Sequence, residues 1–192
     1  MRICVFCGSS PGHDSQYINA AKQLGAALVD LGIGLVYGGA SVCLMGALAD
    51  EVLARGGEVI GVMPKGLVGF EVAHKTLGDL RIVGSMHERK AMMADLSDAF
   101  IALPGGIGTL EETFEMLTWA QLGFQPKPVT LLDIGGFYTK LNGFLDHVVQ
   151  EGFLRAEHRN MLIFESDTQT LLDRIADYEP PVLEKWMSRD QT

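Results

Sequence analysis

The sequence has few cysteines, few basic residues and no long apolar runs, and each shortage argues against a class of protein. Its 192 residues contain three cysteines, an odd number that favours reduced thiols over a disulfide framework. The 15 lysines and arginines are outnumbered by 24 aspartates and glutamates, and the net charge of −9 argues against a nucleic-acid surface. No apolar run approaches a membrane span, and the first residues hold too few apolar side chains for a signal-peptide core. We therefore expect a cytoplasmic protein with no nucleic-acid or membrane partner.

Common nucleotide-binding and metal-binding motifs are also missing. The turn Cys7-Gly8-Ser9-Ser10-Pro11-Gly12 lacks the spacing of G-x-G-x-x-G, which disfavours a dinucleotide oxidoreductase, and the P-loop pattern does not occur. The histidines show no metal-ligand spacing, and the C-x-x-C of Cys4 and Cys7 has no second ligand pair. We predict no metal site and two buried structural thiols.

Apolar runs alternate with helical patterns along most of the chain. The runs lack polar alternation, which is typical of strands buried on both faces of a parallel sheet. We expect one α/β domain over residues 1–180, with a Rossmann-like doubly wound parallel sheet and helices on both faces, and a peripheral tail over residues 181–192. The predicted strands are 3–6, 34–37, 58–63, 80–83, 99–103, 129–132 and 162–164. The predicted helices are 15–30, 43–55, 86–96, 111–122, 138–151 and 168–176.

The stretch from Pro104 to Glu112 joins a glycine-rich turn to the start of a helix. Gly105, Gly106 and Gly108 allow a ligand to approach the backbone, and a helix N-terminus directs free N–H groups at an anion. In doubly wound sheets ligands bind beyond the carboxyl ends of the strands, so the loops there are expected to converge on one crevice. These loops lie at Gly8, Gly38, Ser85 and Gly105. The pattern favours the phosphate of a mononucleotide or a sugar phosphate.

A purely structural interpretation competes at several helix starts. Residues 85–88, 109–112 and 166–169 each fit the capping box, whose side chains satisfy free N–H groups of the first turn. On the residues alone, Arg89 and Lys90 are either an anion grip or a solvated basic pair. The glutamate at position 112 is likewise either a catalytic carboxylate or a cap.

Two stretches together point to a family. Ser85-Met86-His87-Glu88-Arg89-Lys90 and Pro104-Gly105-Gly106-Ile107-Gly108-Thr109-Leu110-Glu111-Glu112 resemble the paired signatures MHxRK and PGGxGTxxE of the LONELY GUY proteins, often labelled "lysine decarboxylase family". Residues 7–10 resemble the first loop of that family. Residues 37–46 resemble its YGGGxxGLMG stretch, with Ala40 and Cys43 where glycine is usual.

The resemblance implies a phosphoribohydrolase, an N-glycosyl hydrolase that cleaves nucleoside 5′-monophosphates such as cytokinin ribotides and AMP into free base and ribose 5-phosphate. It implies that Arg89 and Glu112 are the catalytic pair and that the protein is a homodimer with the site near the subunit interface. No cofactor is expected, because the lysines show no setting for the pyridoxal phosphate that a decarboxylase would need. The residues expected to bind the nucleotide and its phosphate are Ser9, Gly39, Met86, Arg89, Lys90, Gly105, Gly106, Ile107, Gly108 and Thr109.

A second interpretation is a non-catalytic carrier of a nucleotide or of molybdenum cofactor, since proteins resembling such carriers share this fold and glycine loop. A carrier can bind phosphate through the glycines alone. The presence of both Arg89 and Glu112 favours the enzyme, and Glu111, on a different face of the helix, is expected to be a bystander. The sequence does not determine which base is preferred.

Overall fold

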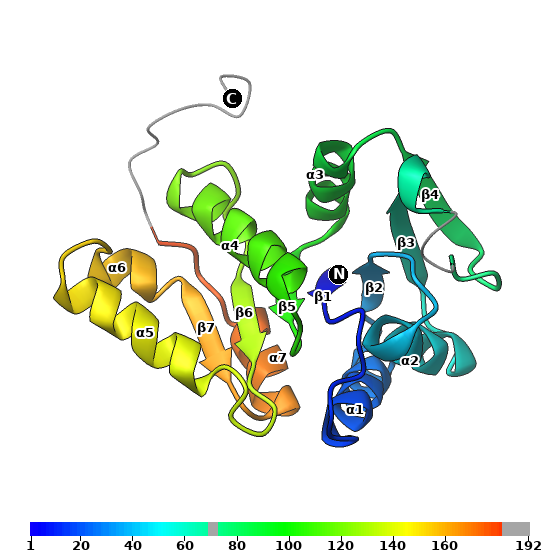
Figure 1. The fold of residues 1–192 in the computed structure, drawn as a ribbon, viewed down its shortest axis with the longest axis horizontal. Helices are drawn as coiled ribbons and strands as arrows, with labels where there is room; N and C mark the ends of the chain where they lie inside the picture. Colours follow the sequence, from blue (N-terminus) through cyan, green and yellow to red (C-terminus); the bar gives the residue numbers. More distant parts are fainter. Residues whose placement is uncertain (69–72, 182–192) are drawn as a thin grey trace.

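A parallel sheet runs through the molecule from edge to edge (Figure 1). The structure, a computed structural model, describes residues 1–68 and 73–181. The strands lie in the order β4-β3-β2-β1-β5-β6-β7, and each adjacent pair is parallel. They are β1 (Arg2–Phe6), β2 (Gly34–Tyr37), β3 (Val59–Pro64), β4 (Asp79–Val83), β5 (Ala99–Ala102), β6 (Val129–Leu132) and β7 (Leu162–Glu165). The predicted doubly wound parallel sheet is confirmed.

The winding direction changes at β1. The chain proceeds outward from β1 to β4 and then returns to form β5 on the other side of β1. Ile3 accordingly pairs with Leu35 of β2 on one side and with Ala99 of β5 on the other. This is the switch point at which a doubly wound sheet opens a ligand crevice beyond its carboxyl ends.

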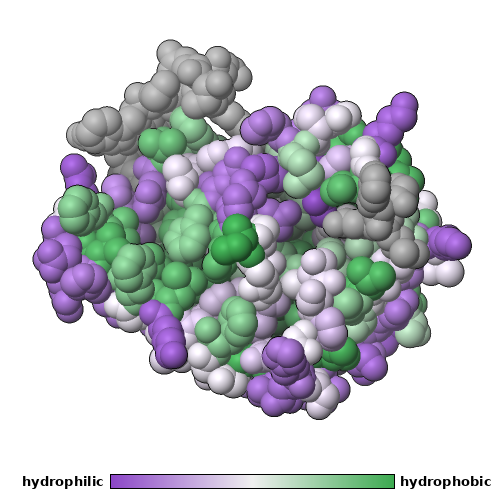
Figure 2. Space-filling view, viewed as in Figure 1, coloured by the Kyte–Doolittle hydropathy of each residue, from purple (hydrophilic) through white to green (hydrophobic). Residues whose placement is uncertain are grey.

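Helices cover both faces of the sheet (Figure 1). One face carries α1 (Gln16–Asp30), α2 (Cys43–Ala54) and α7 (Thr168–Ala176), and the other carries α3 (Met86–Leu96), α4 (Ile107–Gln121) and α5 (Thr139–Gln150). On the surface viewed from the same side, polar and apolar side chains are mixed, with apolar ones gathering over α5 (Figure 2).

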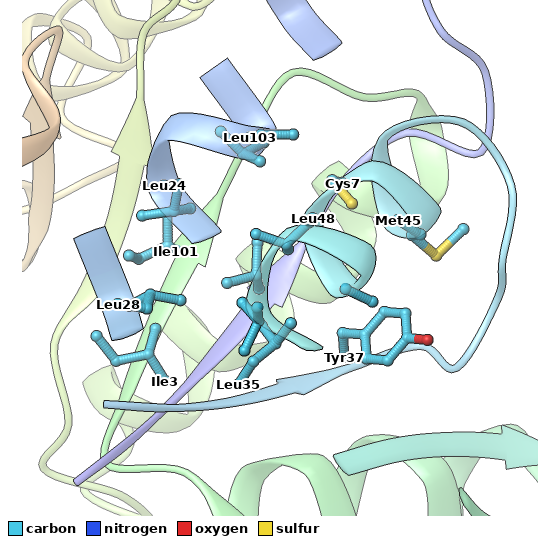
Figure 3. Packing of buried hydrophobic residues seen from close by; sticks show 14 of the residues in the cluster. Ile3, Cys7, Leu24, Leu28, Leu35, Tyr37, Met45, Leu48, Ile101 and Leu103 are labelled. Carbon is cyan, nitrogen blue, oxygen red and sulfur yellow. The ribbon is translucent and has the colours of Figure 1, made fainter. Parts of the chain in front are cut away.

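Two apolar clusters fix this layering. Within β1, Ile3 and Val5 face the cluster beneath α1 and α2, whereas Cys4 and Phe6 face the cluster beneath α3 and α4. Figure 3 shows Leu24 and other α1 side chains packed on the first of these clusters. The two-sided burial explains why the strands lack polar alternation.

Most predicted elements agree with the structure, and a few do not. The predicted left-handed cap after α2 is confirmed, because Gly56 has a φ of +77°. The helix expected from residue 111 begins instead at Ile107. The expected loop over residues 64–75 contains a short 3-10 helix, η1 (Lys65–Leu67), and α6 (Ala156–Arg159) was also not predicted. The segment 69–72 lies outside the described residues.

The predicted domain boundary falls near the end of the described chain. Residue 181 is exposed, and 182–192, nearly all of the predicted tail, lie outside the described residues. Within 1–68 and 73–181, no helix has both the length and the apolar character needed to cross a membrane.

Candidate active site

Two glycine turns meet at the carboxyl ends of β1 and β5. The N–H of Gly8 donates to the carbonyl of Pro104 over 3.1 Å, which joins the two turns directly. A Cβ on Gly8 would lie 3.2 Å from Cα of Gly105, and a Cβ on Gly105 would clash with Oγ1 of Thr109. Close packing therefore requires glycine at position 105 and favours it at position 8, independently of any ligand.

The helix α4 begins directly from the second turn. Gly106 is its N-cap and supplies no side chain, so the first turn has N–H groups without partners in the helix. These groups and the positive end of the helix dipole face the crevice, as an anion site requires.

The predicted capping box at 109–112 is wrong. Thr109 lies three residues inside α4, is buried, and accepts at its carbonyl a 2.6 Å hydrogen bond from the Thr113 hydroxyl. Glu112 is therefore not part of a helix cap. The box predicted at 166–169 is also wrong, because Asp167 caps α7 and accepts from the N–H of Thr170 at 2.8 Å.

The capping box at the start of α3 is confirmed for the Ser85 hydroxyl, whereas Glu88 binds the N–H of Gly84 in place of that of the N-cap residue. The N–H of Glu88 donates to the Ser85 hydroxyl oxygen at 3.1 Å, and the Glu88 carboxylate accepts from the N–H of Gly84 at 2.7 Å. This start fixes the first turn of α3, which directs the next residue, Arg89, into the crevice.

Arg89 is held by backbone carbonyls at the ends of two strands. Its Nε donates to the carbonyl of Val62 and its Nη2 to the carbonyl of Gly38, each at 3.1 Å, and only 8% of its side chain is exposed. A Cβ at Gly38 would clash with the guanidinium. These bonds occupy the edge of the guanidinium that would otherwise grip an anion with two N–H groups.

The third guanidinium nitrogen faces Glu112 across the crevice. Nη1 of Arg89 lies 4.0 Å from Oε1 of Glu112, whose side chain is 14% exposed. This is an ion pair without the contact distance of a hydrogen bond. The two proposed catalytic side chains are thus brought together, from α3 and α4 respectively.

Lys90 has a different set of partners. Its Nζ lies 2.6 Å from Oε1 of Glu111 and 2.9 Å from Oε2 of Glu115, and 8% of its side chain is exposed. Burial, the largest effect, lowers the pKa of Lys90, but the close contacts and negative charges of Glu111 and Glu115 together outweigh burial and leave that pKa raised. Glu111, the expected bystander, is therefore part of the connection between α3 and α4.

A pocket of about 210 Å³ lies beside the glycine turn of β5. Ser9, Gly105 and Gly106 line one side of it, and Tyr17 and Phe137 line another. The two aromatic rings form an edge-to-face pair with centroids 6.0 Å apart. Neither member of the Arg89–Glu112 pair is among the described residues that line the pocket.

The remaining predicted binding residues lie at the turn after β2 and at the starts of α3 and α4. Gly39 follows Gly38, whose carbonyl accepts a hydrogen bond from Arg89. Gly39 has a φ of +80°, a conformation that favours glycine. Met86 and Ile107, at the first turns of α3 and α4, are 42% and 81% exposed. A Cβ at Gly108 would meet open space, so packing alone does not require glycine there.

The two thiols near the crevice are neutral and structural. Burial, followed by the charge of Glu112, raises the pKa of Cys4 and that of Cys7. The prediction of two buried thiols at these positions is confirmed.

Known proteins similar to this chain identify its family. Residues 45–175 match the family described as "Possible lysine decarboxylase". The chain is 52% identical over 180 residues to the probable cytokinin riboside 5′-monophosphate phosphoribohydrolase LOGL5 of Oryza sativa subsp. japonica, covering 94% of this chain and 73% of that protein. It is 49% identical over 179 residues to the cytokinin riboside 5′-monophosphate phosphoribohydrolase LOG1 of Arabidopsis thaliana, covering 93% and 84%. The chain belongs to the LONELY GUY family.

Solved structures of lower sequence identity share the fold of this LONELY GUY chain. The molybdenum cofactor binding protein from Rippkaea orientalis superposes with a TM-score of 0.70 at 20% identity, over 92% of this chain and 95% of that one. The Moco carrier protein from Chlamydomonas reinhardtii gives 0.69 at 20%, with the same coverage. Similarity at this level establishes a common fold and not a common function.

The two departures from the LONELY GUY glycine pattern differ physically. Ala40 is fully buried without a positive φ, so its methyl group is accommodated. Cys43 has a φ of +52° and is the one non-glycine residue among those described with a positive φ. Only the second departure carries backbone strain.

His74 is a buried residue whose role the sequence did not reveal. Its N–H donates to the carbonyl of Gly39 at 3.0 Å, and its buried ring contacts Asp50 at 3.0 Å and Thr76 at 3.1 Å. It therefore ties the turn after β2 to α2. A single histidine between Ala73 and Lys75 gives no sequence signal for such a role. Glu115, in contrast, could have been found by its i, i+4 spacing from Glu111.

Proposed function

We propose that this protein hydrolyses the N-glycosidic bond of nucleoside 5′-monophosphates, cytokinin ribotides and AMP among them, to free base and ribose 5-phosphate. The observation that carries the proposal is the Arg89–Glu112 pair, two nearly buried side chains 4.0 Å apart beside a glycine turn at the switch point of the sheet. The names of relatives with about half of their residues identical support the same reaction.

The glycine turn at residues 105–108 is suited to binding the 5′-phosphate of the nucleotide. The first turn of α4 offers backbone N–H groups and the positive end of a helix dipole, which bind an anion without a cationic side chain. This accounts for anion binding by a protein whose net charge is −9. Ser9 and Thr109 extend this cradle with hydroxyl groups, while Gly39, Met86 and Ile107 surround the rest of the nucleotide.

Glu112 is suited to catalysis at C1′ of the ribose, the reacting carbon. Cleavage breaks the C1′–N bond, whose electron pair leaves with the base, and forms a C1′–O bond from water. Positive charge builds on the ribose as the bond breaks, and a carboxylate stabilises that charge most strongly where water is scarce. Glu112 also accepts the proton of the attacking water, which then passes to the base.

Arg89 is suited to orienting the carboxylate of Glu112. Its bonds to Val62 and Gly38 fix the guanidinium, so that Nη1 faces Glu112 and directs that carboxylate into the crevice. The proposed division is therefore that Glu112 acts on the substrate and Arg89 positions Glu112 and the ribose.

An assay of released base tests the proposal. The purified protein is incubated with a panel of nucleoside monophosphates including AMP and isopentenyl-AMP, and base and ribose 5-phosphate are quantified. Glu112→Gln is expected to lower kcat by roughly 10²–10⁴-fold while nucleotide binding is kept. Glu157→Gln, an exposed carboxylate on α6, is the matched control and retains full activity. Intact nucleotides throughout the panel, together with tight binding of a pterin ligand, would establish the carrier interpretation instead.

We also propose that the protein acts as a homodimer in the cytoplasm. Ile107 and Met86 expose apolar side chains at the edge of the crevice, which supports a partner surface next to the site. The cysteines are all free, which supports a reducing compartment. Light scattering of the purified protein measures its mass, and a monomer at micromolar concentration would refute the dimer.

A further inference from the structure

We propose that Lys90 is a positioning residue whose ion pairs with Glu111 and Glu115 set the distance between α3 and α4, and thereby align Glu112 with Arg89. This inference rests on the proposed function and changes the role expected for Lys90, which the sequence placed among the nucleotide-binding residues.

We call Lys90, Glu111 and Glu115 the clamp. These residues flank the proposed catalytic pair on both helices. Lys90 follows Arg89 on α3, and Glu111 precedes Glu112 on α4, with Glu115 one turn further on. The clamp contacts are short, 2.6 and 2.9 Å, whereas the catalytic pair is separated by 4.0 Å. The short contacts therefore constrain the spacing that the longer one depends on.

The clamp matters because the two helices share one strand, β1, and otherwise rest on different ones. Helix α3 also packs over β2, β3 and β4, and α4 also packs over β5 and β6, on the two sides of the switch point. Arg89 is fixed to the carbonyls at the ends of β2 and β3, while Glu112 moves with α4. A small shift of α4 relative to α3 changes the position of the carboxylate against an immobile guanidinium.

The charges around Lys90 argue against a role as a phosphate ligand. One ammonium faces two carboxylates within 2.9 Å, so the cluster has a net negative charge. An approaching phosphate would be repelled by it, and the ammonium already donates a hydrogen bond to Glu111 and forms an ion pair with Glu115. The side chain is also nearly buried, which restricts a direct contact with substrate.

Lys90→Met tests the clamp because it removes the charge and keeps the length of the side chain. We expect kcat for AMP to fall by roughly 100-fold, as for a catalytic group displaced by about 1 Å. KM and the dissociation constant of ribose 5-phosphate stay within about threefold, since the phosphate cradle is untouched. Lys90→Arg, which keeps the charge, recovers kcat to within about tenfold of the wild type. Lys22→Met, on the exposed face of α1, is the matched control and leaves all values unchanged.

Amide hydrogen exchange provides a readout that does not depend on activity. In Lys90→Met the amides of residues 107–113 exchange faster by about tenfold, while those of α1 do not change. If Lys90→Met fails to fold, Glu111→Gln, which leaves the contact with Glu115, replaces it in the same measurements. Unchanged exchange at 107–113 overturns the inference, as does a loss of ribose 5-phosphate affinity by about tenfold at unchanged kcat. Failure of the proposed function is a separate outcome, recognised by a wild-type protein that binds ribose 5-phosphate but cleaves no nucleotide.

Discussion

At the scale of single residues, Cys43 combines strain with a position at the edge of the crevice. It begins α2 with a φ of +52°, a left-handed conformation that costs a residue with a side chain roughly 1–2 kcal/mol. Glycine removes this cost but gains freedom in the unfolded chain, which offsets about 0.4–1 kcal/mol. We expect Cys43→Gly to raise the free energy of unfolding by up to about 1 kcal/mol, measured by urea denaturation. Cys43→Ala keeps the Cβ and is expected to show no such gain. An equal gain in both variants would trace the effect to the thiol and not to the backbone.

Two buried tyrosines differ in whether their hydroxyl groups are satisfied. The hydroxyl of Tyr138 donates to the carbonyl of Leu103 at 2.7 Å, whereas that of Tyr37 has no hydrogen-bond partner among the described residues. Burial raises the pKa of both phenols, so both hydroxyl groups stay protonated. We expect Tyr37→Phe to stabilise the protein by about 1 kcal/mol and Tyr138→Phe to destabilise it by about 1–3 kcal/mol in thermal unfolding. Destabilisation of similar size in both variants would show that Tyr37 has a partner in solution.

At the scale of elements, the starts of α3 and α4 use different devices although both resemble a capping box in sequence. Ser85 caps α3 through its hydroxyl, so Ser85→Ala is expected to lower the free energy of unfolding by about 1 kcal/mol. Glu112 caps nothing, so Glu112→Gln is expected to lower kcat by roughly 10²–10⁴-fold, while the loss of a nearly buried charge partner of Arg89 costs stability on its own account. Turnover and thermal unfolding of the two variants, measured side by side, separate a capping carboxylate from a catalytic one. Full activity together with lost stability in Glu112→Gln would return Glu112 to a structural role.

The limits of the sequence as a guide follow from how local each feature is. The strand and helix order was predictable because apolar periodicity reports burial one segment at a time. The short helix α6, Ala-Glu-His-Arg, was missed because a single turn shows no period. The start of α4 was misplaced because its N-cap, Gly106, contributes backbone alone, and the Thr109–Glu112 spacing imitated a cap inside the helix.

At the scale of the whole molecule, the pairing of residues far apart in the chain required the fold. The sequence motifs indicated that Arg89 and Glu112 belong to one site, and the structure places them in contact range. The motifs did not indicate that Arg89 is anchored to Val62 and Gly38, or that Lys90 faces Glu111. Such partners depend on where α3 and α4 lie on the sheet, which no local pattern encodes.

The charge of the whole molecule predicts how salt affects catalysis. The net charge is −9, and the cations nearest the proposed site, Arg89 and Lys90, each face carboxylates. A nucleotide dianion is therefore repelled at long range and bound by short-range contacts, chiefly the N–H groups of α4. Salt screens the long-range repulsion within about 10 Å at 0.1 M but affects the nearly buried contacts little. We expect kcat/KM for AMP to rise severalfold, about two- to fivefold, as ionic strength increases from roughly 10 to 150 mM. A fall in kcat/KM over this range would mean that a positive field draws the nucleotide in, and would place further cations, from this chain or from a partner subunit, at the mouth of the crevice.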